Sequence, residues 1–402
     1  MKKILFFGIP AFGHINPTLG MISELVKQGD EVVYFCTEEF RKRIEKTGAK
    51  FRAYKEWEGF SKNKPSIQNK MDIQFMIRIL KTTLESCEKV IDNILEEIGN
   101  EKFDYVGYSA NFPFGNIIAK ILNIPSFSSF AIFATPEEMM PKEFGEARKA
   151  FANDSIIQDY KEISDKLSKK YDIEMPKLQE LFFNRGDINF AYTSKYFVAN
   201  IEKYDDTYKF IGPPIYDRKE DISDFPYKEI KGRKVVYISL GTVYSNYDIK
   251  LYDIFFKAFK DVNVAVVMTA YKTDLSEFDV PKNFIVKNYI SQTEILKYAD
   301  VAVTHSGMNS TNDLLFNNVP FVAIPLGADQ PYMANRAAQL GACISLEKDK
   351  LTPEILRDSV REVLENPKYI ENIKKINESF RECGGYKKAA EEISKLKDMV
   401  LV

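Results

Sequence analysis

One stretch, residues 301–330, limits what this chain can fold into more than any other part of it. It begins with the apolar run Val301–Val303, which is typical of a buried parallel strand. A Ser-Gly turn follows, then a helix start at Asn309–Thr311, and a second apolar run, 319–325, predicts another strand. This order of elements indicates an open α/β sheet, in which ligands bind beyond the carboxyl ends of the strands.

Strands and helices alternate in both halves of the 402-residue chain, which is too long for one ordinary core. We therefore predict an α/β protein with two Rossmann-like doubly wound domains that face each other across a cleft. The expected boundaries are an N-terminal domain over 1–212, a charged linker over 213–233 and a C-terminal domain over 234–385. A last helix, 386–402, is expected to pack back on the first domain.

Composition argues against several kinds of partner. The net charge of −2 gives no strong field for nucleic acid or an anionic membrane, and no apolar run approaches the ~20 residues that span a bilayer. The first residues resemble a secretion signal, but a buried first strand fits them better because no small-residue cleavage site follows. The four cysteines are scattered and lack metal-binding spacing, so reduced thiols in a cytoplasmic protein are expected.

The chain has only two histidines, and each follows a predicted strand. His14 lies in a predicted loop, 11–16, where a neutral imidazole could serve as a general base near pH 7. The alternative is a loop histidine that caps the next helix. His305 holds the same place in the second half, where it could donate a hydrogen bond to a phosphate or simply close the strand by bonding backbone.

Other polar residues gather at the same predicted sheet edge. The helix start after His305 offers unpaired amides, which suit an anion such as a pyrophosphate. Ser310 and Asp313 have the spacing of a capping box, but they equally suit a hydroxyl on phosphate and a carboxylate on ribose. Gly241-Thr242 forms a second glycine turn, and Asp329-Gln330 offers groups to sugar hydroxyls or is an ordinary polar loop.

These motifs together resemble those of a known family. The run HSGMNST at 305–311, with Gln292 before it and Asp329-Gln330 after it, is similar to the donor-binding motif of family 1 glycosyltransferases, which include bacterial macrolide glycosyltransferases. The N-terminal GIPAFGHINPT at 8–18 and ISLGT at 238–242 also resemble that family. Asn335-Arg336 and Leu340-Gly341 extend the similarity, so that it covers nearly the whole chain.

The resemblance implies the GT-B fold, with the acceptor bound by the first domain and a nucleotide sugar by the second. It implies inversion at the anomeric carbon without a metal or a permanently bound cofactor, and it makes His14 the general base. The implied donor-binding residues are Gly13, Ser239, Gly241, Thr242, Tyr289, Ile290, Gln292, His305, Gly307, Met308, Asn309, Ser310, Asp313, Asp329 and Gln330.

Within that set the resemblance assigns separate roles. The diphosphate is held by His305, Asn309, Ser310 and Thr242. Asp313 replaces the usual ribose-binding glutamate. Gln292 lies near the nucleobase and Tyr289 where some relatives place a stacking tryptophan. Asp329 and Gln330 face the sugar.

The chain departs from the family pattern at the residue that supports the base. Relatives place an aspartate there, and this chain has Ser109, so the expected catalytic pair is His14 with Ser109. A serine can hydrogen-bond an imidazole but cannot neutralise an imidazolium, which makes His14 a poorer base. Another acid substitutes, the acceptor hydroxyl is acidic, or activity is weak. Ser306 and Ser291 also replace a glycine and a proline of the pattern.

The expected function is transfer of a hexose, glucose from UDP-glucose, to a hydroxyl of an apolar small molecule such as a phenol, flavonoid or macrolide. TDP-sugars are the other donors considered. Two alternatives stay open: a catalytically silent nucleotide-sugar-binding or auxiliary protein, and a UDP-sugar epimerase. The expected acceptor pocket is aromatic, although most such residues are ordinary core. Its candidates are Phe60, Phe75, Phe112, Phe114 and Phe130.

Overall fold

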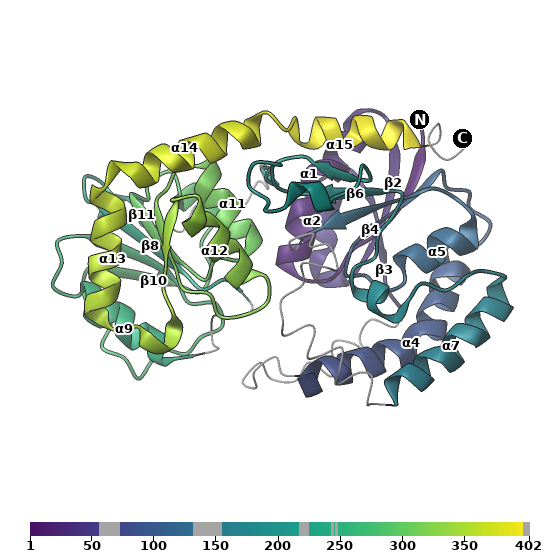
Figure 1. Cartoon of the computed structure of the whole chain (residues 1–402), viewed down its shortest axis with the longest axis horizontal. Helices are drawn as coiled ribbons and strands as arrows, with labels where there is room; N and C mark the ends of the chain where they lie inside the picture. Colours follow the sequence, from purple (N-terminus) through teal and green to yellow (C-terminus); the bar gives the residue numbers. More distant parts are fainter. Residues whose placement is uncertain (56–72, 132–154, 217–224, 243–244, 246–247, 397–402) are drawn as a thin grey trace. The chain divides into compact units, whose positions relative to one another are not determined.

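The computed structural model describes residues 1–55, 73–131, 155–216, 225–242, 245 and 248–396 (Figure 1). Contacts between Cα atoms divide the chain into two compact units. Unit 1 consists of Met1–Tyr192, Asn200–Arg218 and Gly384–Val402, and unit 2 consists of Thr193–Ala199 and Lys219–Cys383. Each unit therefore combines segments that are distant in sequence.

Unit 1 is built on a parallel sheet with the strand order β3-β2-β1-β4-β5-β6-β7 over the described residues. The central strands are buried on both faces, which explains their continuous apolar sequences. The strands are β1 Lys3–Phe7, β2 Glu31–Cys36, β3 Lys50–Ala53, β4 Tyr105–Ser109, β5 Ser126–Phe130, β6 Ile188–Ala191 and β7 Tyr208–Phe210.

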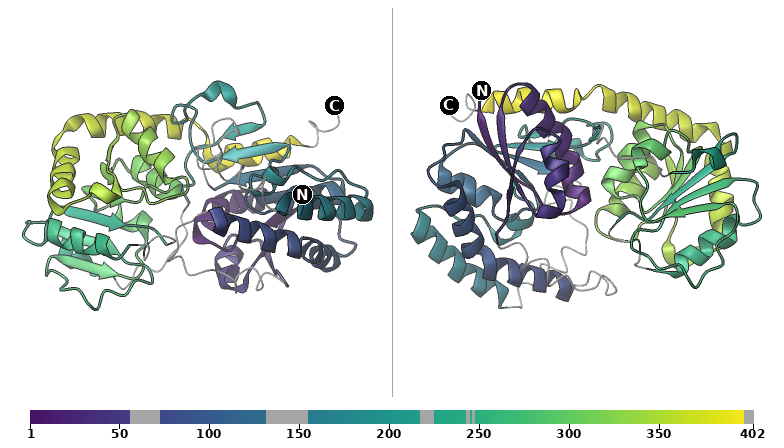
Figure 2. Two further views of the ribbon diagram at one scale, coloured as in Figure 1. Left: turned by 60° about the horizontal axis from the view of Figure 1, so that its bottom comes forward. Right: turned by 180° about the vertical axis from the view of Figure 1, so that it is seen from behind.

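Helices cover both faces of this sheet (Figures 1 and 2). The long helices α4 and α7 pack against each other beside the core, and α15, near the end of the chain, packs on α1. The helices are α1 Phe12–Lys27, α2 Arg41–Glu45, α4 Ile73–Ile98, α5 Gly115–Leu122, α7 Ile156–Tyr171 and α15 Gly385–Ser394, with 3-10 turns at Glu38–Phe40, Leu178–Phe182 and Ile201–Lys203.

Unit 2 repeats the design with the strand order β10-β9-β8-β11-β12-β13, again parallel. Its strands are β8 Val235–Ser239, β9 Ala265–Thr269, β10 Phe284–Lys287, β11 Val301–Thr304, β12 Phe321–Ala323 and β13 Cys343–Ser345. Its helices are α8 Tyr227–Ile230, α9 Lys250–Phe259, α10 Gln292–Ile295, α11 Met308–Phe316, α12 Gln330–Gln339, α13 Pro353–Glu365 and α14 Pro367–Arg381, with a 3-10 turn at Lys348–Lys350.

In each sheet the order of strands reverses at one place. In unit 1 this switch point lies between β1 and β4, where Phe7 pairs with Tyr108, and in unit 2 it lies between β8 and β11, where Ser239 pairs with Thr304. The loops that leave such neighbouring strands diverge and leave room for a ligand. The predicted α/β fold with two doubly wound sheets is confirmed. His14, Ser109 and His305 lie at the ends of these four strands. Other predicted site residues follow neighbouring strands: Tyr289, Ile290 and Gln292 follow β10, and Asp329 and Gln330 follow β12.

Two breaks divide the C-terminal tail into separate helices. Asn366 caps α14 by accepting a bond from the amide of Lys368, and Pro367 takes the first helical position. Gly384 and Gly385 separate α14 from α15, both with positive φ. Within the described residues, no helix combines the length and the apolar character needed to cross a bilayer. The described cysteines are free thiols.

Candidate active site

The imidazole of His305 lies between two glycines at the switch point of unit 2. A Cβ atom at Gly241 would lie 2.6 Å from Nε2 of His305, and a Cβ at Gly307 would lie 2.7 Å from the same atom. Both distances are impossible for a real Cβ, so the two glycines create the space that the ring occupies. Gly241 also needs its freedom because its φ is +73°. The glycine turns predicted after β8 and β11 therefore meet around one side chain.

Burial determines the charge of His305. The residue is 9% exposed, its Nδ1 is buried without a hydrogen-bond partner in the described part of the chain, and burial lowers its pKa to about 4. The ring is therefore neutral at pH 7, with one nitrogen protonated. A neutral imidazole can donate a hydrogen bond to a phosphate oxygen without adding a positive charge.

The turn after β11 contains a strained residue. Ser306 has a φ of +62°, a conformation that favours glycine, and it is fully buried. The amide of Ser306 donates a hydrogen bond of 3.1 Å to Oγ1 of Thr304. The hydroxyls of Ser306 and Thr311 are hydrogen-bonded to each other at 2.9 Å. These bonds hold a serine in a backbone conformation that favours glycine.

Helix α11 begins at Met308, with Gly307 as its N-cap, one residue before the predicted start. Ser310 is therefore the third helical residue, and the capping-box interpretation of Ser310 and Asp313 is wrong. The amides of the first turn point out of the helix beside His305, where they have no intrahelical acceptor. The amide of Met308 in this turn already bonds the carboxylate of Asp329, which shows that the helix start attracts a negatively charged group.

Asp313 and Gln292 form a pair in the interior of unit 2. Asp313 is 2% exposed, and its Oδ2 accepts a hydrogen bond of 2.7 Å from Nε2 of Gln292. The Oε1 atom of Gln292 accepts a longer bond of 3.4 Å from the hydroxyl of Ser310. Residues that the sequence separates by up to 21 positions are thus linked, and the pair fixes the direction of the carboxylate.

Asp329 and Gln330 lie at the start of α12, where Asp329 is the N-cap. Burial raises the pKa of Asp329 to about 6, although the amide of Met308 favours its charged form. Gln330 is buried, and its Oε1 accepts bonds from the amides of Leu326 and Gly327 at 2.7 and 3.2 Å. Its amide oxygen therefore holds the loop before α12, which the sequence did not indicate.

Tyr289 lies near the end of β10 in unit 2 and is 40% exposed, as a stacking platform would need to be. The neighbouring Asn288 accepts a bond of 2.7 Å from the amide of Lys272, which ties this loop to the loop after β9. The remaining predicted donor residues of this unit are placed at the same edge of its sheet: Ser239 ends β8, Thr242 is in the following turn, Ile290 precedes α10, and Met308 and Asn309 open α11.

In unit 1, His14 lies inside a helix and not in a loop. Helix α1 begins at Phe12, so the predicted loop 11–16 is wrong and Gly13 and His14 belong to the first helical turn. The residue is partly exposed, but its Nδ1 is buried without a hydrogen-bond partner among the described residues. Burial lowers the pKa of His14 to about 4, and no described carboxylate raises it.

Ser109 ends β4 on the other side of the same switch point. It is fully buried, and its hydroxyl also has no hydrogen-bond partner in the described residues. A buried hydroxyl without a partner is costly and calls for an explanation. Both members of the expected catalytic pair therefore have a buried polar atom without a hydrogen-bond partner among the described residues, and these two atoms do not bond each other.

Three of the aromatic residues expected to line the acceptor pocket are buried in the interior of unit 1. Phe112, Phe114 and Phe130 are at most 2% exposed. Phe112 stacks on Phe7 and Tyr54 with ring centroids 5.1 and 5.7 Å apart. These three are core residues, as the alternative allowed. Phe60 and the side chain of Phe75 lie outside the described residues.

Sequence reasoning missed the hydroxyl groups that hold the loops of both sites. Tyr54 donates to the carbonyl of Gly8 at 3.0 Å, directly after β1. In unit 2, Ser245 bonds the hydroxyls of Tyr252 and Thr273, each at 3.0 Å. The partners are 7 to 46 positions apart in the sequence, and no local pattern predicts these bonds.

Comparisons with known proteins show which family the chain resembles. A family model described as UDP-glucoronosyl and UDP-glucosyl transferase matches residues 220–382. Two Bacillus subtilis proteins, the uncharacterized UDP-glucosyltransferases YojK and YdhE, are 33% and 34% identical over 398 residues each, covering 98% of this chain and 97% and 98% of theirs. The NDP-glycosyltransferase YjiC of Bacillus licheniformis is 30% identical over 397 residues, 98% of this chain and 97% of its own.

Solved structures show the same fold. The glycosyltransferase of kitacinnamycin has a TM-score of 0.84 at 22% identity, and the calicheamicin glycosyltransferase CalG4 has 0.79 at 22%, each covering 98% of both chains. These are GT-B structures, and this chain has the GT-B fold. The chain belongs to the family 1 UDP-glycosyltransferases. It is an enzyme of the class that transfers a sugar from a nucleotide donor.

Proposed function

We propose that the enzyme moves glucose from UDP-glucose to a phenolic or similarly acidic hydroxyl of an apolar small molecule, with inversion and with His14 as general base. The observation that carries the proposal is the place of His14. It lies at the switch point of its sheet, with a neutral ring and an unused buried nitrogen. Such a group can accept a proton at neutral pH.

The preference for an acidic hydroxyl follows from the surroundings of His14. Its pKa is lowered by burial, and the side chain at the supporting position is Ser109, which carries no charge. A weakly basic imidazole removes a phenolic proton, with a pKa of ~10, far more readily than the proton of an aliphatic alcohol. Phenols and flavonoids are therefore the acceptors we propose first.

For the donor, the arrangement in unit 2 supports a role for each group. The neutral His305 and the amides at the start of α11 would stabilise the charge that the departing diphosphate gains. Asp313, held by Gln292, would accept hydrogen bonds from ribose hydroxyls, and the exposed Tyr289 would stack on the base. Asp329 and Gln330 would contact the sugar. Glucose is proposed because the two Bacillus subtilis relatives are named UDP-glucosyltransferases.

A second candidate is a catalytically silent nucleotide-sugar-binding protein. It is favoured by one observation, the missing carboxylate beside His14. The experiment that separates the two is a mass-spectrometric search for glucosylated products of a phenol panel with UDP-glucose, using the wild type and His14→Ala. Product that forms with the wild type and disappears with the variant supports transfer. Binding of UDP-glucose without any product supports the silent protein.

A further inference from the structure

The helix that carries His14 has a weak point in its second turn. Pro17 lies inside α1, and because proline has no N–H it cannot donate to the carbonyl of Gly13, the bond that would tie these turns together. Thr18 replaces part of that support, since its hydroxyl donates to the carbonyl of Ile15 at 2.8 Å and contacts the hydroxyl of Tyr34 at 2.9 Å. The position of the first turn therefore depends on contacts from outside the helix.

One such contact comes from Tyr386 in α15, almost at the other end of the chain but in the same unit. Its hydroxyl donates to the carbonyl of Pro17 at 2.8 Å. Its ring packs directly on Gly20 of α1, because a Cβ atom at Gly20 would lie only 2.0 Å from Cε2 of Tyr386. The ring of Tyr192 meets it edge to face at 6.4 Å. Tyr386 is thus held on α1 by shape and by a hydrogen bond.

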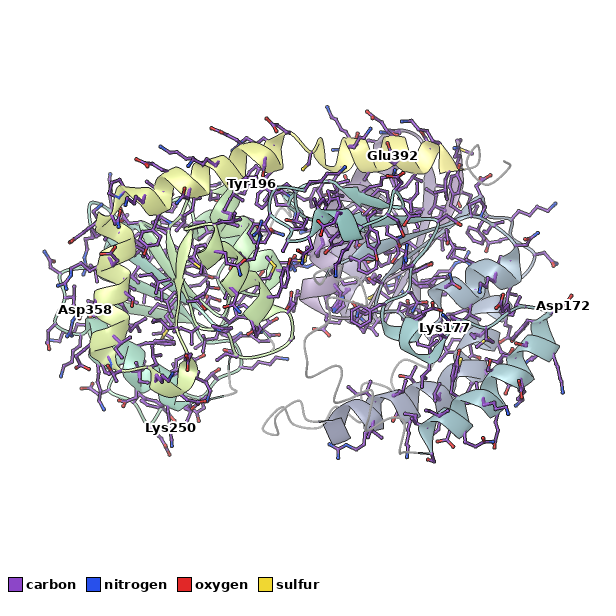
Figure 3. All side chains as sticks on the ribbon, viewed as in Figure 1. Asp172, Lys177, Tyr196, Lys250, Asp358 and Glu392 are labelled. Atoms are coloured by element: carbon purple, nitrogen blue, oxygen red, sulfur yellow. The ribbon has the colours of Figure 1, made fainter. Side chains whose placement is uncertain are left out.

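Helix α15 is itself fixed on unit 1, beside α1 (Figure 1). Lys2 donates to the carbonyl of Ser394 at 2.8 Å. Glu392, labelled on α15 in Figure 3, is 9% exposed and pairs with Lys388 at 3.0 Å and with Lys209 at 3.7 Å. A buried carboxylate needs such partners, so these contacts fix the position of α15 and of Tyr386 on it.

We propose that Tyr386 is a positioning residue for His14. The hydroxyl of Tyr386 restrains the carbonyl of Pro17 and so stabilises a turn of α1 that lacks one helical hydrogen bond. This restraint sets the direction of the His14 imidazole, which lies one turn earlier. The catalytic consequence rests on the proposed role of His14 as the base. The structural consequence, a defined orientation of the His14 ring, does not depend on that role.

The test compares Tyr386→Phe with Tyr160→Phe. The hydroxyl of Tyr160 also donates to a proline carbonyl, that of Pro176, but next to α7 and away from α1. Because the chain has two histidines, the carbon-bound ring protons of His14 and His305 can each be assigned by NMR with one histidine variant apiece. The His14 signal should shift or broaden in Tyr386→Phe and stay unchanged in Tyr160→Phe, and the His305 signal should stay unchanged in both.

Turnover of UDP-glucose with 4-methylumbelliferone, a fluorescent phenol, gives the catalytic readout. In Tyr386→Phe, kcat should fall roughly tenfold, since small errors in placing a catalytic group are costly, while UDP-glucose affinity is unchanged. Gly20→Ala is the second variant: alanine favours the helix but displaces the Tyr386 ring, so it should produce the same shift of the His14 signal.

Two results would overturn the proposal. One is a His14 signal that is the same in Tyr386→Phe and the wild type. The other is a loss of kcat in Tyr160→Phe as large as that in Tyr386→Phe. A different failure, in which His14→Ala keeps full activity while the His14 signal still responds to Tyr386→Phe, would remove the proposed base and leave the positioning contact standing.

Discussion

The two histidines hold corresponding places in two sheets of the same design, yet their neighbours differ. His305 is almost fully enclosed between Gly241 and Gly307 on the turn after β11, whereas His14 is partly exposed on the first turn of α1. In both, Nδ1 is buried without a partner in the described residues, and burial lowers the pKa to about 4.

The difference shows what topology supplies and what it does not. A switch point supplies a place where loops diverge, and it does so in both units. The neighbours then decide the chemistry. An imidazole confined by two glycines beside a helix start is suited to donate to a bound anion, and a neutral imidazole on a partly exposed helical turn is suited to receive a proton.

The largest effects are expected when each imidazole is removed in turn, which tests the different roles of the two histidines. His14→Ala should lower product formation by about 10²–10⁴-fold, the usual worth of a general base, and leave UDP affinity unchanged. His305→Ala should weaken UDP binding. Product formation is measured by mass spectrometry and UDP binding by titration calorimetry. Equal loss of UDP affinity in both variants would contradict the division of roles.

The enclosure of His305 can be tested with a single methyl group. Gly241→Ala should weaken UDP binding about tenfold or more, ~1.4 kcal/mol, because the new Cβ displaces the imidazole. Gly232→Ala is the matched control: Gly232 has a φ of +76°, against +73° for Gly241, but a Cβ there meets nothing within 4 Å. UDP affinity should be unchanged in that control, and an equal loss in both variants would assign the effect to backbone strain.

The missing charge beside His14 can be restored by Ser109→Asp. A carboxylate at this position should raise the pKa of His14 from about 4, so the acid limb of the kcat/KM profile should move to higher pH. The rate with aliphatic alcohols should rise severalfold, because the charged imidazole is stabilised. Ser109→Asn has a similar shape without the charge. If it produces the same change in the pH profile, the electrostatic explanation fails.

Acid should destabilise the fold through both histidines, and this is the smallest expected effect. Their pKa values lie near 4 in the folded protein against about 6.5 in the unfolded chain, so the unfolded chain binds more protons between these values. The free energy of unfolding should therefore decrease as the pH falls from 6.5 to 4. The pKa of Asp329 is raised to about 6, so the folded protein binds this proton more tightly than the unfolded chain does. Asp329 alone would therefore increase the free energy of unfolding as the pH falls from 6 to 3.8.

Melting temperatures measured from pH 7.5 to 4.5 check this expectation. The double variant His14→Gln/His305→Gln should lose less stability over that range than the wild type does. Asp329→Asn should lose more, because it removes a group whose protonation stabilises the fold in acid. A wild-type curve that matches the double variant would mean that the two imidazoles are accessible to protons in the folded state.

Periodicity was enough to predict the sheets, because runs of buried strands such as Val301–Val303 and Val235–Ser239 differ in spacing from amphipathic helices. Helix starts were harder. Phe12 and Met308 open their helices after Ala11 and Gly307, which offer no capping side chain, so the predicted starts came too late. The two histidines lie at the switch points because those places follow from strand order, whereas Gln292 and Asp329 follow the neighbouring strands β10 and β12. The individual roles of the predicted site residues stay predictions.

By itself the sequence determined the fold class, the two sheets and the sheet edge at which the polar motifs gather, since these depend on local patterns along the chain. Only the tertiary structure decided which residues touch. Gly241 and Gly307 enclose His305, and Gln292 donates a hydrogen bond to Asp313. Tyr386 packs on Gly20, which lies more than 360 positions earlier in the sequence. Such contacts depend on side-chain packing between distant segments, which no periodicity records.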